Sequence, residues 1–505
     1  MAQAKRVPVL VDDASAAAPP PSELFQGYDS VTGVGLSTAV QGNTTTIGAR
    51  SEVRYRVCLD ISELVEVLEI SQSLSVGYGP IFSASEKLQF LKSLKVTTYS
   101  LSMIVYARNV VGTDKTTDYA LKNSISPPRT TSELKKFFDD YGDSALVSVT
   151  RGAEYFAVYT FYSQTREEKE QLIIDLKAQG LYNGISVGAE LQTKLDRFTS
   201  STKTRIAFDQ KMFGISRSYP NPSKITEFAL EFPGLPLTKP EIMAFDTIGY
   251  ERVRGVGDAF KTIAANREFF IGANGIAPKL VKVQELENQI ALIQDIYRFY
   301  GSFTDSKLND AAGKAKSDHD TIDALIKRYE EDPAQSFSTP DLPSLRLGTP
   351  SLNCDIKVTP GYGGGGGYPF DDLDFSTAVA TQTRITKLQL RSGEVIDSLI
   401  VTYTNLEKSW TYAHGGDGGA LGNVLQLPGG QFITRVSGRS GSLVDKLRFE
   451  IANGNSIEGG RDGGAAFPDW KPQDGSFLLG FAGRSNKKLD QINLVYGKFA
   501  DAKWK

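Results

Sequence analysis

The last third of this 505-residue chain repeats one short phrase three times, and no other feature constrains the fold as strongly. The copies are RSGEVID at 391–397, RSGSLVD at 439–445 and RSNKKLD at 484–490, which lie 48 and 45 residues apart. A glycine-dense loop accompanies each copy, and the loops are GYGGGGGYPF from 361, GGDGGALG from 415 and GGRDGGAAF from 459. Strand-forming runs rich in Val, Ile, Leu, Tyr and Phe follow the phrases. The repeat therefore predicts three similar small sheets around a pseudo-three-fold axis.

Each copy is a turn that ends in aspartate, which suggests a chemistry as well as a fold. The carboxylate and the backbone N–H groups just before it can converge on one spot, and this suits sugar hydroxyls, which both donate and accept hydrogen bonds. Glycine in the nearby loop has no Cβ to keep a ligand away from the backbone. An alternative interpretation is that each aspartate only braces its turn, as aspartate often does.

Residues 361–505 resemble a jacalin-related lectin domain, an all-β three-fold β-prism. The resemblance implies cell-surface glycans as partners and sugar sites that each combine one turn with a glycine loop. It pairs Gly393, Glu394, Val395 and Asp397 with Gly415 and Gly416; Gly441, Ser442, Leu443 and Asp445 with Gly459 and Gly460; and Lys487, Lys488 and Asp490 with Gly366 and Gly367. In the third turn Asn486 stands where the family has glycine, so the resemblance supports the first two sites more strongly.

Composition argues against several other functional classes. The net charge is -3, so charge gives no indication of a nucleic-acid partner. Cys58 and Cys354 stand far apart in the sequence, which excludes a disulfide framework. With only His319 and His414, the sequence offers little support for a zinc cluster or a histidine-activated nucleophile. We therefore expect no metal, no cofactor and no catalytic residues.

Proline-rich segments mark the domain boundaries. Residues 1–23 are typical of a flexible arm, and residues 24–330 mix strand and helix patterns as one large α+β domain. Residues 331–360 contain five prolines and predict a linker to the lectin domain at 361–505. No apolar run approaches the ~20 residues of a transmembrane helix, and the N-terminus lacks the apolar middle of a Sec-type signal peptide. We expect a protein that is made soluble.

Residues 134–163 contain a helix end, the pair Tyr141-Gly142 and then a long strand with Gly152. The spacing of these residues resembles the signature of the membrane-attack-complex/perforin (MACPF) family. Four neighbours differ from that signature: Asp143, Ser144, Ala145 and Ala153. The resemblance implies a MACPF-like bent antiparallel sheet with flanking helical clusters, here 61–107 and 163–212, each of which becomes a membrane-spanning β-hairpin.

A segment that converts in this way must suit both a helix and an alternating strand. The apolar positions of two alternating runs, 70–84 and 183–195, are Ile70, Leu74, Val76, Tyr78 and Phe82, and Ile185, Val187, Ala189, Leu191 and Leu195. Residues 163–182 predict a helix in the soluble form, with Ser163 or Thr165 as N-cap and Gly180 at its end. Alternation also describes a half-buried strand of a soluble sheet, which is our preferred interpretation for 97–107.

Apolar residues at three- and four-residue steps predict an amphipathic helix over 279–300, and Thr321–Glu331 predicts another. The positions in the first helix are Val283, Leu286, Ile290, Ile293, Tyr297 and Tyr300. We favour a packed scaffold helix over the alternative, an oligomerisation coil.

Together the resemblances imply a pore-forming toxin, insecticidal in action, that works extracellularly on a target cell membrane. It would be a monomer in solution, bind membrane glycans through its lectin domain, form a homo-oligomeric ring and insert two β-hairpins per subunit as a β-barrel. The alternative is a non-lytic glycan-binding or adhesion protein on the same folds. A glycosidase has less support, because adjacent carboxylates such as Asp139-Asp140 point in divergent directions, and we expect no enzymatic activity.

Overall fold

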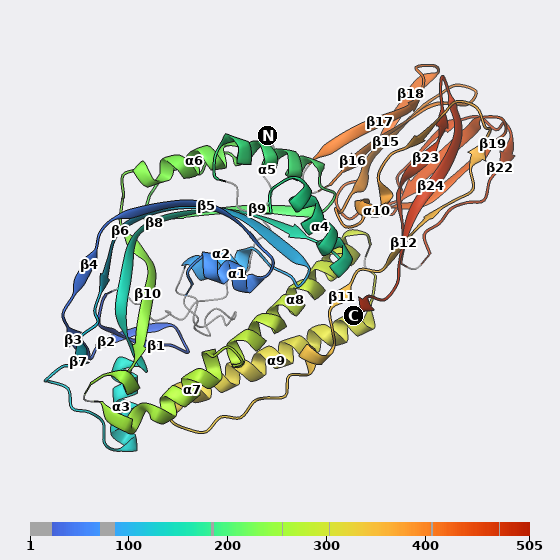
Figure 1. Cartoon of the computed structure of the whole chain (residues 1–505). Coiled ribbons are helices and arrows are strands. Elements are labelled where there is room, and N and C mark those ends of the chain that lie inside the picture. The colour runs from blue at the N-terminus through green and yellow to red at the C-terminus, as the bar shows by residue number, and fades with distance from the viewer. Residues whose placement is uncertain are drawn as a thin grey trace.

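A computed structural model describes residues 23–70, 86–182, 186–254, 256–301, 303–405, 408–473 and 475–505. Within them the chain forms an N-terminal domain of mixed helix and sheet and a C-terminal domain of three small sheets (Figure 1). Five of the expected hairpin residues lie outside the described ranges: Leu74, Val76, Tyr78, Phe82 and Ile185. No helix in those ranges is both long and apolar enough to cross a membrane.

Two long neighbouring strands form the centre of the N-terminal sheet. β6 (Ser100–Lys115) and β8 (Ser144–Tyr162) pair antiparallel along most of their length. Shorter strands extend the sheet on both sides: β4 (Thr45–Ile47) and β5 (Arg50–Cys58) pair with β6, and β9 (Arg205–Phe213) and β10 (Glu241–Gly249) pair with β8. β1 (Gln26–Asp29) and β2 (Val34–Thr38) lie beside the start of β8, and β3 (Val40–Gly42) pairs separately with β7 (Tyr119–Leu121).

The sheet is bent, and its irregularities coincide at one level (Figure 1). The register of β6 shifts between Val110 and Gly112, and that of β10 shifts between Ile242 and Ala244, both next to Gly152 of β8. A Cβ on Gly152 would lie 2.1 Å from Asn109 O, so only glycine fits there. Bulges bend a strand and increase its twist, which explains the position of the bend.

Two groups of helices cover opposite faces of this sheet. α1 (Ile61–Val67) and α2 (Glu86–Ser93) follow β5 in the chain and pack on the face that carries Ile104 and Phe156. α4 (Arg166–Ala178) and α5 (Ala189–Ser201) follow β8 and, with α6 (Ile225–Glu231), pack on the face that carries Tyr155 and Phe161. Figure 1 shows α1 and α2 within the curve of the sheet and α4, α5 and α6 outside it. We refer to α1–α2 as the first cluster and to α4–α5 as the second.

The expected helix within 163–182 is confirmed. α4 has Thr165 as its N-cap, which accepts a hydrogen bond from Glu168 N at 3.1 Å, and Gly180 follows it with φ 65°. Strand β6 begins at Ser100, so most of 97–107 belongs to the sheet, as the preferred interpretation expected. The strand is buried on both faces up to Arg108, and not half-buried. Among the expected hairpin positions, Leu191 and Leu195 lie in α5 and are fully buried against the sheet.

A long helical hairpin connects the two ends of the molecule. α3 (Thr131–Tyr141) and α7 (Lys261–Ile271) lie at one end, and α8 (Ile276–Phe299) and α9 (Ser306–Glu331) run from there to the C-terminal domain (Figure 1). All six predicted apolar positions of 279–300 are buried, as the scaffold interpretation requires. α9 begins well before the predicted Thr321, because Asp305 caps it by accepting from Leu308 N at 2.9 Å.

Three small sheets build the C-terminal domain, two with four strands and one with five, in which β13 also pairs with β24. Their strand orders are β12-β24-β23-β14, β17-β16-β15-β18 and β21-β20-β19-β22. The strands are β12 (Cys354–Val358), β13 (Tyr362–Gly363), β14 (Tyr368–Asp371), β15 (Arg384–Ser392), β16 (Ile396–Thr404), β17 (Ser409–Gly415), β18 (Ala420–Gln426), β19 (Ile433–Ser440), β20 (Val444–Ile451), β21 (Ser456–Gly460), β22 (Ala465–Ala466), β23 (Ser476–Ser485) and β24 (Leu489–Phe499). β12 pairs with β24, so this part of the predicted linker is a strand of the first sheet.

Aromatic side chains join the two domains. The ring of Tyr300 stacks on Phe477 with centroids 4.1 Å apart, and its hydroxyl donates to Thr383 O at 2.6 Å. Tyr297 packs against Phe499 at 4.8 Å. β11 (Pro350–Ser351) also pairs with β25 (Lys503–Trp504) at the end of the chain. The C-terminal domain is therefore packed on the α8–α9 hairpin.

Candidate functional site

The three repeated turns each place an aspartate beside a pair of glycines. A Cβ on Gly418 would lie 2.6 Å from Asp397 Oδ1, and one on Gly419 would lie 2.4 Å from Oδ2. Asp445 has the same relation to Gly463 and Gly464, and Asp490 to Gly366 and Gly367. A side chain at any of these six glycines would occupy the space beside a carboxylate. Glycine therefore keeps that space open in all three copies.

This geometry agrees with the expected pairing for Asp490 and corrects it for the other two turns. Gly415 and Gly460 do not face the carboxylates: their φ angles are 119° and 84°, and a Cβ there would lie within 2.0 Å of the main-chain oxygen of Asp397 or Asp445. Gly416 instead lies against Lys487, and Gly459 lies against Leu390 and Ser392. The loops from 415 and 459 each hold two glycine pairs, and only the second pair reaches the carboxylate. Gly415, Gly459 and Gly460 still belong to the strand ladders.

The turns themselves share one backbone geometry. Gly393 N donates to Val395 O at 3.1 Å, Gly441 N to Leu443 O at 3.0 Å, and Asn486 N to Lys488 O at 3.0 Å. A Cβ on Gly393 would have only ordinary contacts, the nearest at 3.6 Å from Asp397 Oδ2. Asn486 therefore fits the third turn without a change in its backbone.

An arginine that the sequence reasoning missed braces each glycine loop. Arg439 donates from Nε to Gly463 O at 2.9 Å and from Nη2 to Gly464 O at 2.7 Å, and Arg484 binds Gly366 O and Gly367 O in the same way. Arg391 donates to Asp417 O and Gly419 O. The signal was present, because all three phrases begin with Arg-Ser. Charge-assisted bonds of this kind fix the loop in place before a ligand arrives.

The three loops also contact one another's turns in a ring. Gly364 lies against Ser442, and Gly416 lies against Lys487, each with room for no Cβ. The third contact is an ion pair, in which Arg461 Nη1 lies 2.9 Å from Glu394 Oε1. These contacts place the three candidate sites at the same end of the domain.

The carboxylates are partly or wholly withdrawn from water. Asp397 is buried, and Asp445 Oδ2 is buried with no hydrogen-bond partner among the residues that the structure describes. A buried acceptor without a donor is unfavourable, so this atom is available to a ligand hydroxyl. Over the same described ranges, no group of three or more His, Cys, Asp or Glu side chains is arranged to hold a metal ion.

Residues 360–495 match the family model described as the jacalin-like lectin domain. This part of the chain is a jacalin-like lectin domain. Similar solved structures include a Malaysian banana lectin, with 21% identity over 28% of this chain and 98% of its own, and a TM-score of 0.25. A mannose-binding jacalin-related lectin from Ananas comosus has 22% identity over 29% of this chain and 99% of its own, with a TM-score of 0.26. A mannose-binding lectin from champedak has 24% identity over 29% of this chain and 96% of its own, with a TM-score of 0.25.

None of the curated proteins matches the chain. The lectin domain implies carbohydrate binding. Its three turns with Asp397, Asp445 and Asp490 are the candidate sites, and Gly418, Gly419, Gly463 and Gly464 join the expected residues there.

The residues of the MACPF-like signature have structural roles in the N-terminal sheet. Gly142 ends α3 with φ 78°, and a Cβ there would lie 2.4 Å from Tyr28 O, so glycine is required where β8 passes β1. Tyr141 packs on Phe137, with ring centroids 4.9 Å apart. Gly152 lies at the bend of the sheet.

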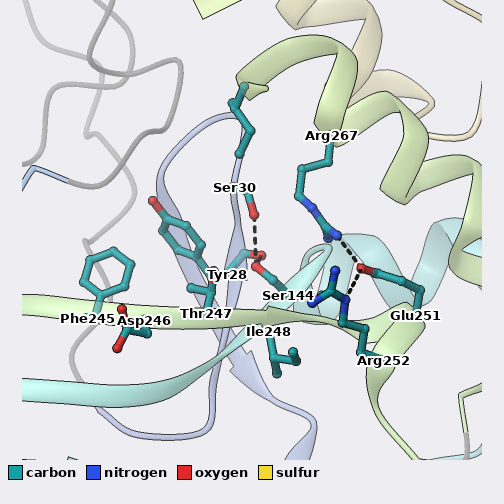
Figure 2. A pocket seen from close by; sticks show the side chains of 12 residues that line it. Tyr28, Ser30, Ser144, Phe245, Asp246, Thr247, Ile248, Glu251, Arg252 and Arg267 are labelled. Carbon is teal, nitrogen blue, oxygen red and sulfur yellow. Dashed lines mark hydrogen bonds and ion pairs between the residues drawn. The ribbon is translucent and has the colours of Figure 1, made fainter. Parts of the chain in front are cut away.

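A cavity of about 390 Å³ lies next to this signature, between the start of β8, β10 and α7 (Figure 2). Its polar side chains are bound to one another: the hydroxyls of Ser30 and Ser144 lie 3.0 Å apart, and Arg267 pairs with Glu251. Behind it, the buried Asp143 accepts from Ser30 Oγ at 2.6 Å, and burial raises its pKa although Arg267 opposes the shift. Pairing within the protein thus accounts for the two serines and Arg267, whereas Glu251 Oε2 is buried without a partner among the described residues.

Proposed function

We propose that the chain is a pore-forming protein that binds glycans of a target membrane through its lectin domain. One observation carries the proposal: each helical cluster replaces the tip of a strand hairpin. The first cluster joins β5 to β6, which pair up to Cys58↔Ser102, and the second joins β8 to β9, which pair up to Tyr162↔Arg205. If a cluster unfolded, its residues would continue strands that are already paired.

The lengths of these segments suit a membrane. Residues 59–99 and 163–204 would give hairpin arms of about 20 residues each, which at ~3.3 Å per residue exceed the ~30 Å hydrocarbon core. The pairs β5–β6 and β8–β9 are also neighbours through β6 and β8, so both hairpins would emerge side by side as four adjacent strands. Leu191 and Leu195, now buried on the sheet, would supply part of the lipid-facing side.

Energetics require assembly before or during insertion. A lone hairpin in hydrocarbon would leave the N–H and C=O groups of its outer edges unpaired, at several kcal/mol each. Closure of the strands into a barrel removes those edges, and a head-to-tail contact between identical subunits closes a ring. Several weak sugar sites per subunit would hold the subunits on one surface and raise their effective concentration. We place this action outside the producing cell, against a foreign membrane, with insect cells as the proposed target.

Locking the second cluster to the sheet tests the proposal. Phe161 of β8 and Phe198 of α5 have ring centroids 5.5 Å apart, so cysteines at these two positions can be joined by a short cleavable crosslinker. Both positions are buried, so the reagent is added during refolding, and Cys58 and Cys354 are changed to serine so that only the engineered thiols react. We expect the crosslinked protein to bind glycan-bearing vesicles without releasing a trapped dye, and cleavage of the linker to restore release.

Each single-cysteine variant treated with the same reagent is the matched control. Dye release by the fully crosslinked protein would contradict hairpin conversion of this cluster. Binding without dye release in the control and wild-type proteins alike would favour the adhesion alternative instead.

A further inference from the structure

The three repeated turns share one backbone geometry but differ strongly in charge. Each candidate site consists of one phrase, from its arginine to its aspartate, and of the five loop residues that end in its glycine pair, at 415–419, 460–464 and 363–367. The first site has one arginine and three carboxylates, which gives a net charge of -2. The second has two arginines and two carboxylates and is neutral. The third has one arginine, two lysines and one carboxylate, which gives +2.

Differences in both the turn and the loop produce this contrast. At the two central turn positions the residues are Glu394 and Val395 in the first copy, Ser442 and Leu443 in the second, and Lys487 and Lys488 in the third. In the loop, the residue before the glycine pair is Asp417, Asp462 and Gly365, respectively. The third site therefore has two lysines more and two carboxylates fewer than the first.

The two lysines stand on an ordered turn, and both are exposed. Asn486 N donates to Lys488 O at 3.0 Å, and the main chain of Lys487 lies against Gly416 of another glycine loop. The first turn pairs its glutamate with an arginine of the neighbouring loop, whereas neither lysine pairs with a carboxylate among the residues that the structure describes. Their ammonium groups are therefore open to a ligand beside Asp490.

The carboxylate half of the site is the same in all three copies. Asp490 lies beside Gly366 and Gly367, as Asp397 and Asp445 lie beside their own glycine pairs. Such a carboxylate accepts hydrogen bonds from sugar hydroxyls, but it also repels a negatively charged group on the same sugar. In the first site, further carboxylates add to this repulsion. In the third site two lysines outweigh it, since ammonium groups bind anions through charge-assisted hydrogen bonds.

We propose that the third site binds a sugar that carries a carboxylate or sulfate group, with its ring hydroxyls at Asp490 and its negatively charged group at Lys487 and Lys488. The first and second sites take uncharged sugars. This specificity rests on the glycan binding of the proposed function and not on pore formation. A membrane that displays both neutral and acidic glycans is then held by more sites per subunit than one that displays either kind alone.

Binding to immobilised hexoses tests this specificity in an Asp397→Asn, Asp445→Asn background, which leaves only the third site. The probes are glucose, galactose and mannose, each displayed at high density as the neutral sugar, the 6-sulfate and the uronic acid. We expect an acidic form to bind about fivefold to tenfold more tightly than its neutral parent, which is the range of two exposed charge pairs. The preference should weaken as salt rises, because the charges are exposed. Comparison of the sulfate with the uronate distinguishes the two sources of negative charge.

Exchange of the turn residues removes the lysines and keeps the backbone. Lys487→Ser with Lys488→Leu gives the third turn the residues of the second, whose backbone hydrogen bond is the same. We expect this variant to bind each acidic sugar and its neutral parent within about twofold of each other, with an unchanged melting temperature. Lys357→Met is the matched control, because it removes an exposed lysine of β12 that pairs opposite Tyr496, ~20 Å along β24 from Asp490, and should keep the preference.

Several outcomes would overturn the proposal. These are no binding at the third site, equal binding of acidic and neutral sugars there, and a preference for acidic sugars that survives the exchange. Asp490→Asn in the same background should abolish binding of every probe, and acidic sugars that still bind would show that the lysines attract anions without a sugar site. If the wild type bound no member of the panel, the proposed glycan binding itself would be contradicted, whereas dye release from vesicles reports only on pore formation.

Discussion

The lectin domain and the N-terminal domain both position polar groups, but they do so over very different distances along the chain. In the lectin domain, Asp445, Gly463 and Arg439 belong to one short unit, and backbone contacts settle their arrangement. In the N-terminal domain, Glu154 of β8 is held by Arg108 of β6 and by Lys87 of α2. The first arrangement leaves a carboxylate oxygen open to a ligand, whereas the second has its charges paired internally.

This difference has a mechanical consequence. Lys87 also donates to Leu68 O at 3.1 Å and to Met243 O at 2.6 Å, and Arg108 Nη1 reaches Glu69 Oε1 at 3.2 Å, so one network ties the first cluster to the sheet. On the other face, Lys169 of α4 donates to Leu59 O at 2.6 Å and Thr98 O at 3.1 Å. In the lectin domain, arginine side chains brace the glycine loops beside the aspartates. The helical clusters are held by polar contacts, which would have to break if the clusters left the sheet as proposed.

Removing the charge at the centre of the network that ties the first cluster to the sheet should have the largest effect. Glu154→Gln leaves Lys87 buried without its counter-charge and leaves Arg108 only the more exposed Glu52 and Glu69, so we expect a loss of about 3–5 kcal/mol in the free energy of unfolding. All three tryptophans, Trp410, Trp470 and Trp504, lie after residue 400. Tryptophan fluorescence in denaturant therefore follows the C-terminal part, and circular dichroism at helical wavelengths follows the N-terminal domain.

The comparison between domains predicts that only the helical signal moves. Lys135→Met, which breaks an exposed pair with Asp139 on α3, is the control and should change stability by less than about 1 kcal/mol. A parallel shift of both signals in Glu154→Gln would show that the domains unfold as one unit, and the contrast drawn above would fail.

A second pair of buried acids should make the N-terminal domain sensitive to pH. Burial, and then the charge of Asp143, raise the pKa of Asp29 to about 7. The folded protein therefore holds a proton that the unfolded chain has already released between about pH 4 and pH 7. The free energy of unfolding should fall as the pH rises through this window, and Asp29 adds no further change above it.

Asp29→Asn tests this dependence. The asparagine Oδ1 can still accept from Val31 N, now at 2.9 Å from Asp29 Oδ1, so the loop geometry is kept. We expect the variant to gain about 2 kcal/mol or more near pH 7.5 relative to the wild type, with a shallower slope below pH 7. The tryptophan signal of the lectin domain should show neither change. An unaltered slope in the variant would mean that Asp29 is ionised in the folded protein.

The same contrast explains what could be predicted from the sequence. The three sheets, the turns and Asp397, Asp445 and Asp490 were predictable, because each repeat carries its own glycines and aspartate. The choice between Gly415-Gly416 and Gly418-Gly419 was not, since it depends on where the ladder of β17 ends.

Contacts between segments that lie far apart in the chain could not be predicted from the sequence. Nothing local connects Lys87 to Glu154, or Lys169 of α4 to the main-chain oxygens of Leu59 and Thr98. β12 was not predicted either, because its partner β24 lies more than one hundred residues further along the chain. The long helix α8 was predictable, since its apolar spacing is a local property.

The smallest expected effect concerns the arginine braces of the lectin loops. Arg439→Lys keeps the charge but cannot donate from two nitrogens to Gly463 O and Gly464 O at once, so the loop beside Asp445 should lose some of its order. We expect sugar affinity at the second site to fall about two- to fivefold, equivalent to ~0.5–1 kcal/mol, with no shift in either unfolding transition. The measurement is calorimetric titration in an Asp397→Asn, Asp490→Asn background, which isolates the second site, with a glycan chosen by array screening of the wild type. Arg435→Lys, an exposed arginine on the same strand that pairs with Asp469, is the matched control and should bind as the parent does. If Arg439→Lys also binds unchanged, glycine alone orders these loops, and the lectin sites owe their rigidity to backbone geometry instead of to charge.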